Sequence, residues 1–403
     1  MTAIAERLEV QRLLTPRWIG ILGIAIGVVA FWISLPPVAQ RTLFWPIVVG
    51  AAAAALGGWA IVHGERRVGW GAVASGALGG GLGVLATYSS VTHLDTVFVW
   101  GALLAAMLRY ATPLTFAAIG GMFSERSGVV NIGLEGMMLM GAFFGIWGAD
   151  VAGSWIVGIL IAMAFGGLLA LVHAFFAIHL RADQIVGGVA INFLALGITG
   201  YMFIDVYGSQ GTPANVPAIP DVHIGGLDKI PPGAFWDDLF GQLNLMIWIS
   251  FLVLVLSYVV MFRTPLGLRI RSVGEHPKAA DTVGISVYGI RYGAVVLSGI
   301  LSAMGGAYLS IGFVHSFNQN MTAGRGFIAL AALIFGKWRP GGAFAAALLF
   351  GFSSALAQRL PTYSGSAATL FQTLPYVLTL IAVAGVIGRS IPPAADGRPY
   401  VKQ

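Results

Sequence analysis

Apolar segments long enough to cross a lipid bilayer recur along almost the whole chain. A transmembrane helix needs about 20 predominantly apolar residues, and the sequence predicts twelve segments of this kind: 18–35, 43–63, 68–91, 97–120, 132–149, 154–180, 185–205, 244–262, 293–314, 325–336, 341–358 and 371–388. Segment 325–336 is too short to cross alone, and Pro113 and several glycines interrupt 113–135. We therefore expect an all-α, polytopic transmembrane bundle of about 10–12 spans, some of them broken or re-entrant.

Composition supports the same fold class and excludes others. Charged residues make up 9% of the 403 residues, whereas a soluble domain has about 25%. This excludes a soluble enzyme, a nucleic-acid-binding domain and a disordered protein. The 56 glycines indicate close packing of helices in lipid, where small residues let backbones approach. The absence of cysteine excludes disulfides, thiolate metal sites and cysteine nucleophiles.

Two loops of opposite charge predict the orientation in the membrane. The acidic loop (residues 206–243) carries four aspartates and one lysine, whereas the basic loop (residues 263–292) carries five basic and two acidic residues. Because cytoplasmic loops collect Lys and Arg, we expect the basic loop and both termini inside and the acidic loop outside. The acidic loop forms either an irregular cap with a short helix near 233–241 or a solvated linker.

A faint internal repeat relates residues 131–145 to residues 322–336. In the predicted topology the two copies cross the membrane in opposite directions. Inverted repeats are a common plan in transporters, with the substrate path between the halves. Because the copies share only small residues, chance similarity is the alternative.

Two ionisable residues stand out within predicted spans, Arg109 near the middle of 97–120 and Glu135 in the first turn of 132–149. Charges in the membrane are costly and face a protein interior or an aqueous path. The two side chains either line a polar path, where they could pair, or have a structural role. The structural role is an ion pair between helices or, for Glu135, hydrogen bonds to free backbone N–H groups at a broken helix start.

Four uncharged polar residues lie in or beside spans: Asn131, Gln184, Asn192 and Gln372. They line a path for a polar solute or form hydrogen bonds between helices, worth roughly 1 kcal/mol each. His173 and His179 are placed at a membrane interface rather than as ligands. The sequence has no zinc-binding His-Glu-x-x-His, no Gly-x-Ser-x-Gly and no phosphate-binding loop. It therefore predicts no catalytic residue, metal site or bound cofactor, and any ATP that drives transport is hydrolysed by another polypeptide.

The basic loop contains a predicted short helix. Pro277 suits the first helical position because it lacks an N–H group, residues 278–283 can form about two turns, and Gly284 suits a helix end. The helix either docks into a groove on a partner protein or lies on lipid headgroups.

Four motifs in this sequence resemble those of bacterial ABC-importer permeases for nucleosides and simple sugars, the branched-chain amino acid and ribose type. They are residues 125–142, 181–192, 264–280 and 336–342, and the resemblance covers roughly 97–390. It implies that the basic loop engages a separate cytoplasmic ATPase, which binds ATP and Mg, through Arg269, Arg271, Gly274, Glu275, Pro277, Lys278, Ala279, Ala280, Asp281 and Gly284.

The resemblance also implies an assembly and a domain plan. The assembly contains two ATPase domains, a second related permease and an extracytoplasmic binding lipoprotein, in the bacterial cell membrane. Residues 97–390 would form the permease domain, 1–96 an extension with about three extra spans, and 391–403 a cytoplasmic tail. The solute would be a nucleoside, with riboflavin, sugars and amino acids as alternatives. The competing functions are an autonomous ion-coupled transporter, a membrane scaffold and, more remotely, a membrane-embedded enzyme.

Overall fold

The computed structural model describes residues 15–33, 42–87, 99–230, 233–359 and 390–402, and it divides into two compact units. Unit 1 comprises residues 1–104 and 353–389, and unit 2 comprises residues 105–352 and 390–403. Among the described residues, eight helices are long and apolar enough to span a membrane. The prediction of a polytopic helical membrane protein is confirmed, whereas the predicted segment 371–388 lies outside the described residues.

In unit 1, three helices pack against one another through small side chains. They are α2 (Pro16–Ile33), α3 (Phe44–Val62) and α4 (Arg66–Thr87). A Cβ atom at Gly76 would lie 2.4 Å from the Gly50 carbonyl oxygen. Only glycine allows α3 and α4 to approach this closely, which explains part of the glycine excess.

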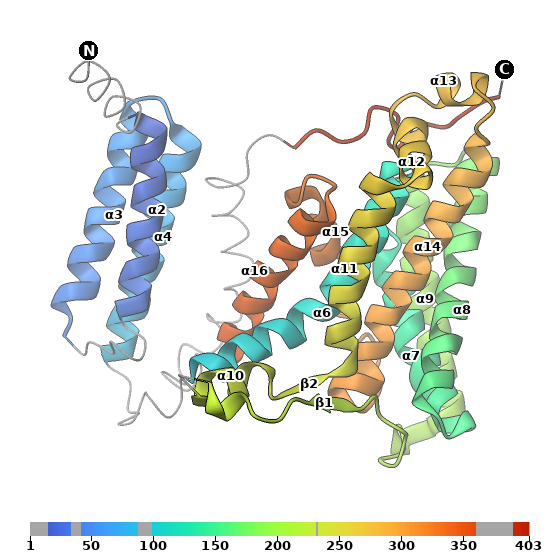
Figure 1. Ribbon diagram of the computed structural model, residues 1–403, viewed down its shortest axis with the longest axis horizontal. Helices are drawn as coiled ribbons and strands as arrows, with labels where there is room; N and C mark the ends of the chain where they lie inside the picture. Colours follow the sequence, from blue (N-terminus) through green and yellow to red (C-terminus); the bar gives the residue numbers. More distant parts are fainter. Residues whose placement is uncertain (1–14, 34–41, 88–98, 231–232, 360–389, 403) are drawn as a thin grey trace. The chain divides into compact units, whose positions relative to one another are not determined.

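Unit 2 contains seven of the eight long apolar helices and the shorter apolar helix α15. They are α6 (Trp100–Arg126), α7 (Leu134–Ala152), α8 (Trp155–Ala174) with the π-helix η1 (Phe175–His179), α9 (Gln184–Tyr207), α11 (Leu245–Arg263), α14 (Val287–Ala307) with the π-helix η4 (Tyr308–Val314), α15 (Arg325–Phe335) and α16 (Pro340–Arg359). The boundary between the units falls within α6 and α16. Helix α7 lies in the interior and packs against α8, α9, α14 and α15 (Figure 1).

Helix α6 corrects one expectation. We expected Pro113 and the following glycines to break the chain over 113–135, yet α6 continues through Pro113 to Arg126. The backbone around Pro113 packs on Gly305 of α14, where a Cβ atom would lie 2.8 Å from the Pro113 carbonyl oxygen. Packing therefore holds the helix where proline removes one hydrogen bond. The break comes later, at residues 127–133.

The two loops lie at opposite ends of unit 2 (Figure 1). The acidic loop contains η2 (Gly208–Gln210), β1 (Asp221–His223), η3 (Leu227–Lys229), α10 (Gly233–Phe240) and the start of β2 (Gln242–Asn244). Strands β1 and β2 pair antiparallel, with Asp221 opposite Asn244. Helix α10 confirms the short helix expected near 233–241. The acidic loop thus marks the β1–β2 end of unit 2, and the basic loop marks its α13 end.

The basic loop forms two helices, α12 (Pro265–Glu275) and α13 (Pro277–Thr282). The sequence predicts one short helix in the basic loop, which is α13, so the second helix, α12, is a correction. Its start carries two ordinary signals: Pro265 occupies the first turn, and the Thr264 hydroxyl accepts a hydrogen bond from the Gly267 N–H at 3.3 Å. The end of α13 follows the prediction, because Gly284 has a φ of +82° and donates to the Asp281 carbonyl.

Candidate functional site

A non-helical segment, residues 127–133, enters the bundle between α6 and α7. Away from water, its backbone groups need partners within the protein. Gln184, at the start of α9, accepts a hydrogen bond from the Val130 N–H at 2.7 Å, and His173 Nε2 lies 3.1 Å from the Val130 carbonyl oxygen. Gln184 and His173 are therefore held against this segment from two other helices.

Asn131 and Asn192 bind the same segment closer to α7. The Asn131 amide donates to the Ser298 hydroxyl of α14 at 2.9 Å, and its oxygen accepts from the Gly133 N–H at 3.1 Å. The Asn192 oxygen accepts from the Gly136 N–H at 2.7 Å, and its amide donates to the Ile132 carbonyl at 3.0 Å. Three of the four predicted uncharged residues thus surround the start of α7, while Gln372 lies outside the described residues.

Glu135 binds the start of a different helix, α15. Its Oε1 accepts from the Gly324 N–H at 2.8 Å and its Oε2 from the Gly326 N–H at 2.5 Å. A Cβ atom at Gly326 would lie 2.4 Å from the backbone of Glu135, so only glycine fits there. The first N–H groups of any helix lack intrahelical acceptors. The carboxylate supplies them for α15 and places a negative charge at the positive end of the helix dipole.

The starts of α7 and α15 therefore meet inside the bundle. Helix α7 runs from this point to the β1–β2 end, where Asp150 accepts a hydrogen bond from Tyr207. Helix α15 runs to the α13 end, where the turn after it binds Arg126 through the Trp338 carbonyl. These two helix starts lie in the two segments compared above as a possible internal repeat, and they point in opposite directions.

Arg109 lies apart from this site. Its guanidinium donates to the carbonyl of Gln242 in β2 at 3.1 Å, at the β1–β2 end. Glu135 binds α15 instead, so the pairing of Arg109 with Glu135 considered from the sequence is wrong. The reason is geometric, because Arg109 occupies the first half of α6 whereas the start of α7 follows the opposite end of that helix.

The two ends of α15 are held by two different carboxylates. At the α13 end, Glu125 accepts a hydrogen bond from the Trp338 indole N–H at 2.5 Å, and the Arg126 Nε donates to the Trp338 carbonyl at 3.0 Å. Lys337 and Trp338 both have positive φ angles, which are uncommon for residues other than glycine. Two of the sequence motifs, residues 125–142 and 336–342, therefore contact each other, which their sequences do not predict.

Helix α13 presents an exposed face at the end of the bundle. Lys278 and Ala279 are exposed, Val283 is 74% exposed, and Ala280 on the other side is buried. Gly274 packs on the Arg126 carbonyl, which leaves no space for a side chain. The remaining predicted members of this loop are Pro277 at the first helical position, Asp281, half-buried, and Glu275, exposed.

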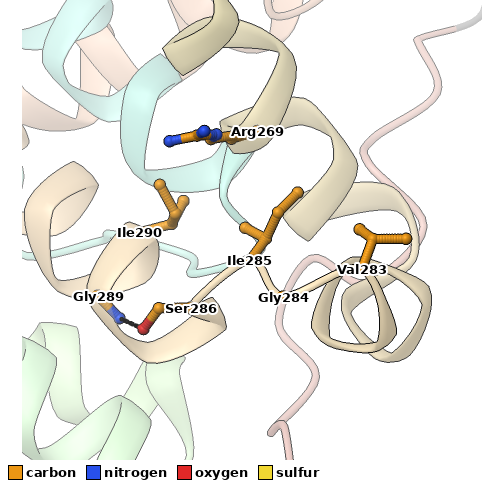
Figure 2. A pocket seen from close by; sticks show the side chains of 7 residues that line it. All are labelled: Arg269, Val283, Gly284, Ile285, Ser286, Gly289 and Ile290. Atoms are coloured by element: carbon orange, nitrogen blue, oxygen red, sulfur yellow. Dashed lines mark hydrogen bonds between the residues drawn. The ribbon is translucent and has the colours of Figure 1, made fainter.

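Two hollows flank α13. A pocket of about 380 Å³ lies between α12 and the start of α14, lined by Arg269, Val283, Gly284, Ile285, Ser286, Gly289 and Ile290 (Figure 2). Ile285 and Ile290 point towards Arg269, while Val283 points away (Figure 2). A groove of about 600 Å³ lies on the other side, between residues 275–279 and residues 394–401. Arg271, the other predicted arginine, stacks 5.2 Å over the Phe262 ring.

Arg291 and the C-terminal segment take part in this end of the bundle, although their sequence does not predict it. Arg291, in the first turns of α14, is fully buried and binds backbone carbonyls of Ser127 and Arg398. Beside it, burial raises the pKa of the Asp396 carboxyl to about 7, although the Gly397 N–H and the Arg291 guanidinium act in the opposite direction. Within the described part of the chain, no group of three His, Asp or Glu side chains could hold a metal ion.

Comparison with known proteins gives one family. The family model for the branched-chain amino acid transport system permease component matches residues 103–383. The chain is 44% identical over 321 residues to the guanosine ABC transporter permease protein NupQ of Bacillus subtilis, covering 77% of this chain and 99% of that protein. It is 41% identical over 318 residues to the nucleoside ABC transporter permease protein NupC of Lactococcus lactis, covering 74% and 96%.

One of the other relatives is named for a different solute. The putative glucose ABC transporter permease protein TsgC13 of Haloferax volcanii is 35% identical over 263 residues, covering 65% of this chain and 78% of that protein. No solved structure matches the chain.

Proposed function

This chain belongs to the family of branched-chain amino acid transport system permease components, and from that premise we propose that it is a permease subunit of an ATP-binding cassette importer for nucleosides. The chain is a multi-pass membrane protein, and its function is transport without covalent change to the solute. The observation that carries the nucleoside proposal is the 44% identity across 99% of a guanosine permease.

We propose that the exposed face of α13 couples the permease to a separate ATPase. This face consists of Lys278, Ala279, Thr282 and Val283, and it lies at the end of the bundle with the basic loop. Because basic loops favour the cytoplasmic side, a cytoplasmic ATPase would meet α13 first. Arg269, Arg271, Gly274, Glu275 and Pro277 would position α13 rather than contact the partner.

We place the solute path beside the starts of α7 and α15. Half-helix starts that meet inside a bundle between two inverted repeats are the usual setting of a transporter path. Glu135 and Asn192 would then set the position of both helix starts, and Asn131 and Gln184 would fix the segment that leads into α7. Arg109 would act at the β1–β2 end, where we expect the binding lipoprotein to deliver the solute.

The remaining partners follow from the family. A second, related permease would complete the membrane unit, since the relatives include two different permeases from Bacillus subtilis, NupQ and NupP. We propose the bacterial cell membrane as the location, with both termini in the cytoplasm. Neighbouring genes that encode an ATPase, a second permease and a lipoprotein would support this assembly.

The test of the function is reconstitution of the chain with its ATPase, second permease and lipoprotein in nanodiscs. We expect nucleosides to stimulate ATP hydrolysis, with glucose, riboflavin and amino acids in the same panel. Stimulation by glucose alone would show that the solute is a sugar rather than a nucleoside, and the proposal of an importer would still hold. Solute uptake into liposomes by the chain without any ATPase would favour an autonomous ion-coupled transporter instead.

Val283→Asp tests the assignment of α13. Placing a charge on a 74% exposed apolar side chain should weaken ATPase binding at least about tenfold if Val283 is buried at the interface. Val151→Asp is the matched control, because Val151 is 70% exposed and lies at the β1–β2 end of α7. Equal ATPase co-purification with both variants and the unchanged chain would contradict the docking role.

A further inference from the structure

The C-terminal residues 394–400, the tail segment, run along the α13 end of unit 2 and bind the basic loop (Figure 1). The Ala395 N–H donates to the Gly274 carbonyl at 2.9 Å, and the Ala394 N–H donates to the Glu275 carboxylate at 3.2 Å. Both acceptors belong to the last residues of α12. The tail segment is thus attached to the junction between α12 and α13.

The tail segment is also attached to α14 and to the segment after α6. The buried Arg291 side chain donates from Nε to the Ser127 carbonyl at 3.2 Å and from Nη1 to the Arg398 carbonyl at 3.1 Å. Gly128 lies directly against this guanidinium, with space for no side chain. One arginine therefore joins three separate stretches of backbone.

An apolar cluster completes the contact. Tyr400 is 5% exposed and packs with Val273 of α12, Ala280 of α13 and Val287 of α14. Ala280 is the buried residue of α13. A helix of six residues is too short to be stable by itself in water, so its position depends on these few contacts.

We propose that the tail segment fixes the position of α13 relative to α6 and α14, and that ATPase binding and solute transport require this attachment. The proposal rests on the function proposed above. Its physical reason is preorganisation, because a docking helix that is already held in place loses less conformational entropy on binding. A movement of α13 would also be transmitted to α6 and α14 by the tail segment, in addition to the covalent connection along the backbone.

The attachment itself is testable without any partner. The chain contains no cysteine, so a single Ala395→Cys variant has one thiol to label. Ala395 is 6% exposed whereas Ala394 is exposed. We expect a maleimide to label Ala395→Cys at least about tenfold more slowly than Ala394→Cys. Adding Tyr400→Ala should raise the Ala395→Cys rate towards that of Ala394→Cys, and equal rates in the two single variants would overturn the attachment.

The consequence for function is measured in the assembled importer. Tyr400→Ala should weaken ATPase binding about tenfold and lower solute uptake, while the thermal stability of the bundle in detergent stays unchanged. Lys402→Gln, an exposed residue beyond the tail segment, is the control. Wild-type ATPase affinity and uptake in the Tyr400→Ala importer would overturn the proposal. Failure of the unchanged chain to bind any ATPase would instead reject the function on which it rests, and the labelling rates would be unaffected.

Discussion

The starts of α7 and α15 meet in the interior of unit 2, and they are satisfied by different chemistry. The Gly136 N–H of α7 donates to a neutral amide oxygen from Asn192. The first N–H groups of α15 donate to the two oxygens of a carboxylate, Glu135. Hydrogen bonds to an ionised acceptor are roughly twice as strong as neutral ones. The comparison indicates that the position of α15, the shorter helix, depends more on one side chain than the position of α7 does.

Glu135→Gln should have the largest effect. The glutamine amide retains one acceptor oxygen but brings an NH₂ group against the N–H of Gly324 or Gly326, which leaves a buried donor unpaired. We expect a loss of about 2–3 kcal/mol in stability and a several-fold loss of solute uptake. Thermal unfolding in detergent and uptake by the reconstituted importer measure both quantities.

Asp150→Asn is the matched control for that variant, since Asp150 is a carboxylate on the same helix that accepts one hydrogen bond, from Tyr207. It should leave uptake near the wild-type value. Wild-type stability and uptake for Glu135→Gln would mean that α15 is positioned by its apolar packing alone.

Gly326→Ala should have the next largest effect. The added methyl would lie 2.4 Å from the Glu135 backbone, which cannot move aside as a flexible side chain does. We expect a cost of about 1–3 kcal/mol from overpacking, measured by thermal unfolding. Gly197→Ala adds the same methyl where nothing lies within 4 Å, so it should not lower stability, because alanine has a higher helix propensity than glycine. Equal stability changes for the two variants would show that contact with Glu135 imposes no cost on an alanine at position 326.

Asn192→Ala should have the smallest effect of the three. It removes the acceptor of the Gly136 N–H and the donor to the Ile132 carbonyl. Both partners are backbone groups, and both hydrogen bonds are neutral. We expect a loss of about 1–2 kcal/mol in the same unfolding assay. A larger loss than that of Glu135→Gln would reverse the comparison between the two helix starts.

Most helix positions could be predicted from the sequence, because span length and hydropathy are local properties. The predicted segments 43–63 and 185–205 differ from α3 and α9 by at most two residues at either end. The break predicted at Pro113 is absent, since the packing that keeps α6 continuous comes from Gly305, far along the chain. Helix α12 was not predicted although Thr264 and Pro265 carry start signals, because residues 263–292 were treated as a loop between spans.

The candidate site was predictable in its residues but not in its partners. Glu135 is predictable as a carboxylate that binds free N–H groups at a broken helix start, which describes the observed bonds. That the helix is α15 is not predictable, because Gly324 lies 189 residues further on. Arg291 was counted only as one basic residue of a loop, since nothing local indicates that it is buried. The tail segment has Pro, Gly and charged residues typical of a free terminus, so its attachment depends entirely on distant contacts.

The bond between Glu135 and α15 has an electrostatic consequence for any solute that passes the start of that helix. A helix start carries about half a positive charge, the carboxylate of Glu135 opposes it, and Arg325, the first residue of α15, adds a positive charge beside it. These charges largely offset one another, so an uncharged solute would experience little net force at this point. A nucleoside, the solute proposed above, carries no phosphate and is uncharged in this sense.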